Sequence, residues 1–270
     1  MRNFITTHEK QKSVGYKVLL KVITFAVLFQ LWAGSALAQV NQSKITQGDA
    51  ICIESNSIPD HKVGEFPNRA NPHSIREQRI KLCVSSNPKK NSKPQFIKGT
   101  IGIALNGIQF RPNTAGSYDP SSKSGHSRNG DKRWTLDIFE AKNRLGLDMN
   151  NGHVGPNGLY HYHGIAESLI GNSASSFIGY AGDGFEIHFV GRKVRSGYTL
   201  RSGERPSGPR GAFDGTFNED YVYSGDHETL DECNGGQLNG KYVYFVTLDY
   251  PFIGRCLWGD IAPGFGADRH

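Results

Sequence analysis

Eight short runs of β-branched and aromatic residues, separated by Gly, Pro, Asn and Asp, constrain the fold of this chain more than any other feature. Runs of this length and composition predict strands, and the residues between them predict turns. One run, "IGIAL" at residues 101–105, is apolar throughout and predicts a strand in the centre of a sheet. We therefore expect a mainly β domain, built as a sandwich or as a barrel-like fold.

Helical periodicity is scarce in the rest of the chain. The segment 135–146, "TLDIFEAKNRLG", predicts one short helix that ends at Gly146, and "IAESLIG" predicts one or two further helical turns. Two segments, 112–131 and 196–218, consist largely of Gly, Pro, Ser, Asn and charged residues and predict long surface loops. Strand-like runs continue on both sides of each loop. We expect a single domain at residues 39–270, with its core at about 49–259.

The first 38 residues have the pattern of a signal peptide. A basic segment precedes an apolar run that ends in Ala36-Leu37-Ala38, the small-residue pattern of a cleavage site. We predict cleavage after Ala38, export to the periplasm or the medium, and no membrane span after cleavage.

The charge of the chain is concentrated in this leader. Residues 1–38 hold five basic residues and one acid, a net charge of +4, so only +2 of the total of +6 remains on residues 39–270. The basic character of the full chain therefore does not indicate a nucleic-acid or anionic-membrane partner. The sequence identifies no particular protein or glycan partner.

All four cysteines follow the leader. An even number of cysteines in an exported chain indicates disulfides. We favour Cys52–Cys83 and Cys233–Cys256, because each pair is close in sequence. A crossed pairing and free buried thiols remain the alternatives.

Two segments of the chain resemble each other. "LDMNNGHVGPNGLYHYH" at 147–163 and "LDECNGGQLNGKYVYF" at 230–245 both begin with Leu-Asp-x-x-Asn-Gly and end in a Tyr-x-Tyr-x strand. Asp148 and Asp231 occupy equivalent places, which favours a shared turn-capping role. The second copy has Gly236, Val243 and Phe245 where the first has His153, His161 and His163. Folding alone does not require this difference, so we expect the chemistry in the first copy.

The three histidines predict a metal site. Side chains at i and i+2 of a strand point to the same face, so His161 and His163 stand side by side, and the turn upstream can supply His153. Three neutral imidazoles suit Zn, Cu, Fe or Ni, and we favour copper or zinc. His61 or Asp183 can complete the site or orient a ligand. A hydrogen-bonded histidine network and metal-free acid–base catalysis remain alternatives.

The chain resembles the YHYH-domain family, named after the tetrapeptide at residues 160–163. The resemblance also includes "SNSIPDHKVGEFPN", "NPHSIREQ", "GIALNGIQF", "IGYAGDGFEIHF" and "YPFIGRCLWG". It implies an exported, mostly β protein whose reaction is not defined. His153, His161, His163, His61 and Asp183 match the family pattern, whereas His188 does not. Gly236 and "YVYF" depart from the second histidine-bearing copy that the family often has.

Several functions remain open at this point. Zinc would suit hydrolysis and copper would suit storage or redox chemistry, but no phosphate-binding loop, nucleophile elbow or His-Glu-x-x-His helix is present. The chain is alternatively a surface interaction module, with the histidines as a brace and the segments 112–131 and 196–218 as its working parts. A cupin-like metalloenzyme is a weaker alternative. Gly155, His161, His163 and Glu167 match its first motif, while Ala174 and Asp214 replace the expected Gly and His.

Overall fold

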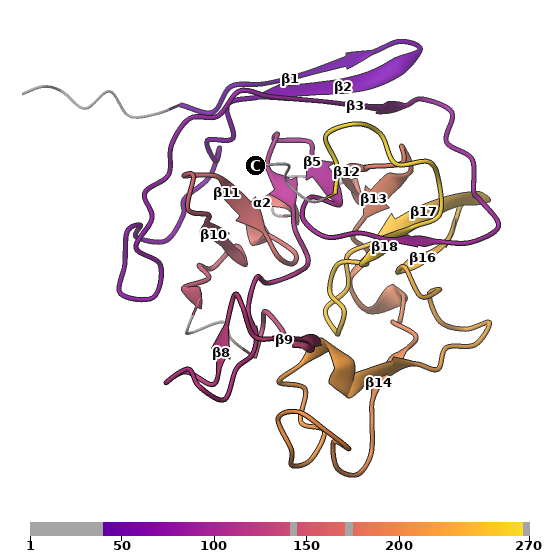
Figure 1. The fold of residues 1–270 in the computed structure, drawn as a ribbon. Coiled ribbons are helices and arrows are strands. Elements are labelled where there is room, and N and C mark those ends of the chain that lie inside the picture. The colour runs from indigo at the N-terminus through magenta and orange to yellow at the C-terminus, as the bar shows by residue number, and fades with distance from the viewer. Residues whose placement is uncertain (1–39, 141–144, 171–174, 267–270) are drawn as a thin grey trace, which may run out of the picture. The chain divides into compact units, whose positions relative to one another are not determined.

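The computed structural model describes residues 40–140, 145–170 and 175–266 (Figure 1). The predicted signal peptide, residues 1–38, lies outside the described residues. The described chain is mainly β, as expected. No helix in these ranges is both long and apolar enough to cross a membrane.

An open sheet of eight strands forms the centre of the domain. In spatial order its strands are β10 (Gly152–Val154), β11 (Tyr160–Tyr162), β6 (Gln109–Phe110), β5 (Gly102–Ala104), β12 (Phe177–Ala181), β13 (Glu186–His188), β17 (Lys241–Phe245) and β16 (Gly235–Leu238). The apolar run "IGIAL" supplies β5, a buried central strand, as predicted. The order begins with β10 and ends with β16, so the sheet does not close into a barrel.

A second sheet covers part of one face of the large sheet. It contains β1 (Ser43–Gln47), β2 (Ala50–Ser55) and β3 (Ile80–Ser85). Ile53 and Leu82 of this sheet pack against Ile103 and Tyr180 of the large sheet in one buried cluster. This packing of two sheets is sandwich-like, and burial of apolar side chains between them stabilises it.

The order of the large sheet repeats internally. Two hairpins, β5–β6 and β10–β11, make one half, and β12–β13 with β16–β17 make the other. In each half, the second strands of the two hairpins run parallel to each other. These parallel pairs are β6 with β11 in the first half and β13 with β17 in the second. The halves meet at the antiparallel pair β5–β12. The similar segments 147–163 and 230–245 are thus the second hairpins of a larger structural repeat. The resemblance within the sequence marks only these second hairpins.

The turns of the first hairpins match as well. Gly107 and Gly184 adopt the left-handed backbone region, with φ of 80° and 95°. At both positions a Cβ would meet neighbouring atoms of Ser55 or Ser85 at less than 3.0 Å, so a side chain does not fit. Asn106 precedes Gly107, and Asp183 precedes Gly184. These two polar residues therefore occupy equivalent places in the two halves.

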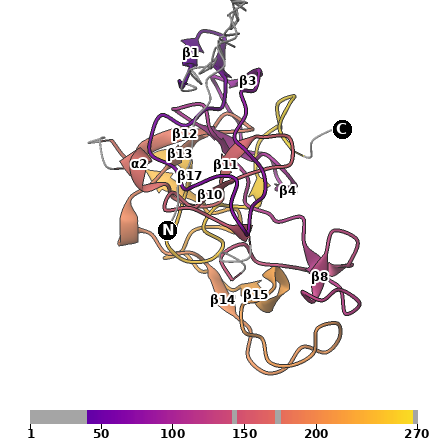
Figure 2. The same cartoon turned by 90° about the vertical axis from the view of Figure 1, so that its left-hand side faces the viewer.

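The segments predicted as long loops carry short strands of their own. Strands β7 (Ser117–Tyr118), β8 (His126–Ser127) and β9 (Asp131–Thr135) form one small sheet, and β14 (Tyr198–Leu200) pairs with β15 (Tyr221–Tyr223). Outside the two segments, β4 (Gln95–Phe96) pairs with β18 (Cys256–Leu257). β8 and β14 lie at the end of the domain opposite β1 and β3 in both views (Figures 1 and 2).

A buried ion pair fixes the second of these segments. The Arg205 side chain is 4% exposed and donates to both oxygens of Asp220, which is fully buried. Arg205 also pairs with Asp214. Hydrogen bonds to charged groups of this kind hold a Gly-rich segment in one conformation although it offers few apolar side chains.

One of the two helix predictions is wrong at its start. Thr135 ends strand β9, and Leu136 pairs with Phe217 in an isolated bridge, while residues 141–144 lie outside the described residues. Trp134, Leu136 and Phe217 form a buried cluster, and this tertiary contact overrides the local helical pattern. The other prediction is confirmed by α2 (Glu167–Ile170). The 3-10 turns η1 (Gly191–Lys193) and η2 (Asn218–Asp220) were not predicted.

Both predicted disulfides are present. Cys52–Cys83 joins the paired strands β2 and β3, and Cys233–Cys256 joins the β16–β17 half to β18. These two bonds engage all four cysteines of the sequence. Disulfides are compatible with an extracellular or periplasmic protein.

Candidate metal centre

An aspartate at the start of the β10–β11 hairpin sets its geometry. The Asp148 carboxylate accepts hydrogen bonds from the backbone N–H groups of Asn150 (2.9 Å) and Gly152 (3.1 Å). Its other oxygen accepts from the Tyr160 hydroxyl at 2.8 Å. Asn151 adopts the left-handed region with φ of 52°, which Asn tolerates better than most residues. The turn therefore brings His153 back beside the next strand.

The second hairpin repeats this arrangement. Asp231 accepts from the backbone N–H groups of Cys233 (3.0 Å) and Gly235 (2.8 Å) and from the Tyr242 hydroxyl (2.7 Å). Asn234 has φ of 59°. The predicted turn-capping role of the two aspartates is confirmed.

Strand alternation separates the histidines from the tyrosines. Tyr160 and Tyr162 are fully buried in the largest apolar cluster. His161 and His163 point to the other face, and His153 is the direct cross-strand partner of His161. His161 is 6% exposed and His163 is 2% exposed, so both imidazoles are held in a largely dry environment. The tyrosines thus anchor the strand that carries the histidines.

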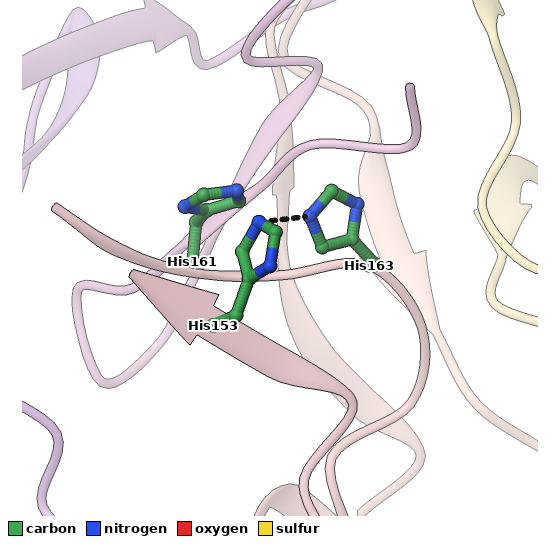
Figure 3. A group of neighbouring side chains, drawn as sticks. All are labelled: His153, His161 and His163. Atoms are coloured by element: carbon green, nitrogen blue, oxygen red, sulfur yellow. Dashed lines mark hydrogen bonds between the residues drawn. The ribbon is translucent and has the colours of Figure 1, made fainter. Parts of the chain in front are cut away.

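The three imidazoles point toward one another (Figure 3). One ring nitrogen from each lies within 4.8 Å of the others, and the Nε2 atoms of His153 and His163 are 3.2 Å apart. Tetrahedral zinc with Zn–N bonds of about 2.0–2.1 Å would place two ligand nitrogens roughly 3.3 Å apart. The separation of this pair therefore fits two ligands of one ion.

Backbone carbonyls orient two of the rings. Nδ1 of His153 lies 2.8 Å from the Leu145 carbonyl oxygen, and Nδ1 of His161 lies 3.1 Å from that of Leu159. A carbonyl only accepts, so both rings carry their proton on Nδ1 and present the Nε2 lone pair to the group. This is the usual orientation of metal-binding histidines, whose other nitrogen donates to a carbonyl or carboxylate.

The hydrogen-bonding requirements of the third ring, that of His163, are harder to satisfy without an ion. With Nε2 of His153 accepting, a hydrogen bond to His163 requires the proton of His163 on Nε2. The Nδ1 atom of His163 is then a buried acceptor without a donor among the described residues. A hydrogen bond from the His163 ring to the Arg111 backbone opposes the lowering of its pKa and needs a protonated ring nitrogen, which favours the other tautomer. Orphaned buried polar atoms are costly. A cation bound to the Nε2 atoms would remove the need for that hydrogen bond and let Nδ1 carry the proton.

Electrostatics keep the group neutral. Burial lowers the pKa of His161 and His163 well below the ordinary histidine value, and it also lowers the pKa of His153. The Arg111 guanidinium lowers all three pKa values further, since it disfavours additional positive charge nearby. Neutral imidazole is the form that binds metals.

The corresponding place in the other half is apolar. Val243 and Phe245 occupy the positions of His161 and His163, and they form a buried cluster with Leu230. A Cβ on Gly236, the counterpart of His153, would lie 2.9 Å from Leu230 and 3.4 Å from Phe245. The same scaffold is therefore filled by hydrocarbon in one half and by three imidazoles in the other.

The structure does not bring His61 to the histidine group. Its Nε2 atom contacts the Tyr162 hydroxyl at 2.5 Å, and Tyr162 faces away from the group. Nδ1 of His61 lies 3.1 Å from the Asn150 side-chain amide. His61 therefore holds the back of the strand through its tyrosine.

Asp183 also lies elsewhere, in the other half of the sheet. Its carboxylate accepts from the Tyr244 hydroxyl (2.7 Å) and the Gly259 N–H (2.8 Å). In the first half, Asn106 donates to the Tyr162 hydroxyl at 3.0 Å. Asp183 and Asn106 thus play matching roles, each tying a hairpin turn to a tyrosine of the parallel strand.

His188 is also separate from the group, as are Glu167 and Asp214 of the cupin-like alternative. The rings of His188 and Phe245 are 6.5 Å apart, and His188 bonds to Ser176 (2.9 Å) and Glu186 (2.7 Å). Glu167 is exposed at the start of α2, and Asp214 pairs with Arg205. Glu167 and Asp214 do not lie where a cupin-type centre would need them.

A cavity of about 630 Å³ opens beside the three histidines. Its walls include Arg111, Arg128, His73 and His126, which the sequence alone does not indicate as site residues. Much of one wall comes from the segment 113–128, inside the predicted loop at 112–131. None of the described residues that line this cavity is an aspartate or glutamate. Arg128 lies inside the Gly- and Ser-rich segment and Arg111 directly precedes it, and these two cations are the sequence feature that could have indicated this wall.

The family-level comparison agrees with the geometry. The family model described as "YHYH protein" matches residues 81–259, which is more than half of the chain and includes all three histidines. No curated protein and no solved structure matches the chain. The tetrapeptide Tyr160–His163, held between a buried tyrosine face and a histidine face, lies at the centre of the matched region. The chain belongs to the YHYH protein family.

Proposed function

We propose that this chain is an exported YHYH protein that binds one copper or zinc ion through His153, His161 and His163. The observation that carries the proposal is the convergence of three ring nitrogens within 4.8 Å of one another. His153 and His161 come from the adjacent strands β10 and β11, and His163 directly follows β11. The sheet and the turn at Asp148 fix their positions.

The donor set supports a site with an open position. Among the described residues, no fourth His, Cys, Asp or Glu joins the three histidines. Sets of three histidines are typical of zinc sites that leave a place for water or substrate. The cavity beside the rings provides access to that place. Zinc there would supply Lewis acidity and copper would supply redox chemistry or storage. His153, His161 and His163 would hold the ion, and the cavity wall would orient whatever reaches it.

A structural brace is the second candidate, favoured by one observation. His153 and His161 each bond a backbone carbonyl, as histidines in a purely structural network would. A brace predicts that removal of His161 lowers stability equally with and without metal. The buried Nδ1 of His163, which has no donor among the described residues when Nε2 carries the proton, argues for the metal site.

Elemental analysis tests the proposal. The protein is prepared without a histidine tag, beside His161→Ala/His163→Ala. About one equivalent of copper or zinc in the wild type and none in the variant is the expected result. The identity of the metal chooses between redox and Lewis-acid chemistry. Absence of metal in both proteins, together with no thermal shift on adding either ion, would contradict the proposal and favour the brace.

A further inference from the structure

A second cavity adjoins the one beside the histidines. It has a volume of about 650 Å³ and shares with the first Arg111, Arg128 and the residues 113–115. Residues that line both cavities place the two side by side, and we refer to the two cavities together as the trough. The first cavity borders the histidine group, and the second is also lined by Phe96, Tyr198 and Tyr250.

The trough concentrates positive charge. Its lining residues include five that are basic and one that is acidic, namely Lys98, Arg111, Arg128, Lys132, Arg255 and Glu219. Their summed net charge is +4, or +3 once the ion pair of Arg255 with the buried Asp137 (3.4 Å) is taken into account. Residues 39–270 as a whole carry only +2 (+6 for the chain minus +4 for residues 1–38). The remainder of residues 39–270 is thus slightly acidic. A trough of this kind raises the local concentration of anions and steers them to its floor.

The one acid in the lining, Glu219, is already included in this net charge. The Glu219 carboxylate accepts a hydrogen bond from the Thr135 N–H at 2.6 Å. Burial raises the pKa of Glu219, so its ionised form is disfavoured relative to an exposed glutamate. Lys98 and Arg128 are exposed and carry their charges toward solvent and ligand.

The aromatic lining indicates a ligand with flat, partly apolar faces. Phe96 is 66% exposed at the trough and lies near Lys98 in sequence. An exposed phenylalanine beside a cation suits a pyranose ring that carries a carboxylate or sulfate, because the ring presents C–H groups to the aromatic face. Tyr250 is not available for such stacking, since Tyr221 lies 3.6 Å from one face and the Arg255 guanidinium 4.6 Å from its centre.

We propose that the trough binds an extended acidic oligosaccharide. Lys98, Arg128 and Lys132 pair with successive carboxylate or sulfate groups, Phe96 supports one sugar ring, and a further anionic group reaches the histidine centre. This last contact rests on the proposed metal function, whereas the trough itself does not. A single-stranded nucleic acid needs several aromatic platforms for its bases, and Phe96 is the only strongly exposed aromatic residue among the described residues of the trough. The two disulfides also favour a compartment in which glycans are the abundant polyanions.

Calorimetric titration tests the inference. The probes are a hexamer of galacturonate, a heparin hexasaccharide, neutral maltohexaose and a single-stranded DNA 12-mer, each at low and moderate NaCl. The proteins are the wild type, Lys98→Glu/Arg128→Glu and the control Lys89→Glu/Lys241→Glu. Both variants change the charge equally, but Lys89 and Lys241 are exposed and line neither cavity. Lys98→Gln/Arg128→Gln keeps the test valid if charge reversal impairs folding. Each protein is measured with and without bound metal.

The expected result is binding of at least one acidic hexasaccharide that weakens with salt. The trough variant should lose about tenfold or more in affinity for the acidic sugars. This corresponds to the loss of roughly one exposed ion pair at each of the two substituted positions. The control should change less than about twofold, and maltohexaose should not bind. The galacturonate and heparin arms distinguish carboxylate from sulfate recognition.

Three results would overturn the inference. They are binding of maltohexaose as tightly as of the acidic sugars, tighter binding of DNA than of either acidic sugar, and absence of acidic-sugar binding at low salt. Because sugar binding is also measured in the metal-free protein, the result for the trough can be separated from the result for the metal proposal. Sugar binding without any metal uptake would support the proposal for the trough and contradict the proposal for the metal centre. Metal uptake without sugar binding would do the reverse.

Discussion

The Nε2 atoms of His153 and His163 face each other at 3.2 Å across the β10–β11 hairpin. His153 lies in β10 and His163 directly follows β11, and the Asp148 turn determines the register of these two strands. Two neutral imidazoles so placed either share one proton or hold one cation. When a cation is bound, each Nδ1 can donate a hydrogen bond. We therefore expect metal binding to stabilise the β10–β11 hairpin.

Replacing His161 by valine, its counterpart in the other half, should abolish metal binding without disrupting the sheet. Val243 shows that the scaffold accepts valine at this position. At a free metal concentration of 100 times Kd, the wild type should gain about 2.7 kcal/mol in unfolding free energy. The variant should gain much less. Urea unfolding with and without zinc or copper measures both, and an equal gain in the variant would contradict the site.

The metal-free protein should lose stability as the pH falls below about 6.5. Burial holds the pKa of His161 and His163 well below the unfolded value of about 6.5. Between the two values the unfolded state binds protons that the folded state does not, so acid favours unfolding. Each histidine contributes a slope of up to about 1.4 kcal/mol per pH unit.

The measurement for this prediction is urea unfolding at several pH values between 5 and 8. His161→Val removes one of the depressed groups and should reduce the slope in that window. A slope that is unchanged in the variant would show that His161 titrates normally in the folded protein. His227, which is exposed and outside the group, gives the matched control as His227→Ala.

Asp148→Ala and Asp231→Ala form a matched pair, because the two carboxylates bind equivalent backbone and tyrosine donors. Each substitution leaves buried donors without an acceptor and should cost about 2–4 kcal/mol. Only Asp148→Ala should also weaken metal binding, since only its hairpin carries the histidines. Unfolding and metal titration of both variants test this. Equal loss of metal affinity in the two would show that general destabilisation, and not positioning, is responsible.

Asp183→Asn should leave metal stoichiometry unchanged and stability nearly so. The amide oxygen can still accept from Tyr244 and Gly259. Burial raises the pKa of Asp183, which means that its ionised form is disfavoured by its surroundings, and the amide removes that charge. We expect a stability change within about 1 kcal/mol. Loss of the metal in this variant would assign Asp183 to the site despite its distance from the group.

Arg205→Ala should destabilise the protein by about 3–5 kcal/mol, because it leaves the fully buried Asp220 carboxylate without its partner. Arg133→Ala breaks an exposed pair with Asp131 and should have no measurable effect. Thermal unfolding of both variants checks the contrast. A small effect at Arg205 would show that water reaches Asp220 and that the segment 196–218 is held by other contacts.

The histidine site and the loop at 112–131 appeared from sequence as rival explanations of function. The structure joins them, since residues 113–116 and 126–128 form a wall of the cavity into which the imidazoles face. Sequence separates these residues from His163 by more than thirty positions, and no periodicity links them. The low net charge of residues 39–270 also concealed the basic trough, because a sum over the chain does not show where charges gather.

The sequence by itself predicted the eight main strand runs, the favoured pairing of the cysteines, the Asp-capped turns and the gathering of His153, His161 and His163. These features depend on the alternation of side chains along a strand, on the residue types that form turns, and on short distances along the sequence. All three act between residues that are close in sequence. Only the tertiary structure decided the positions of His61 and Asp183, the strand in place of a helix at Thr135 and the basic trough. Each of those depends on contacts between distant segments, where burial and side-chain hydrogen bonds outweigh local preference.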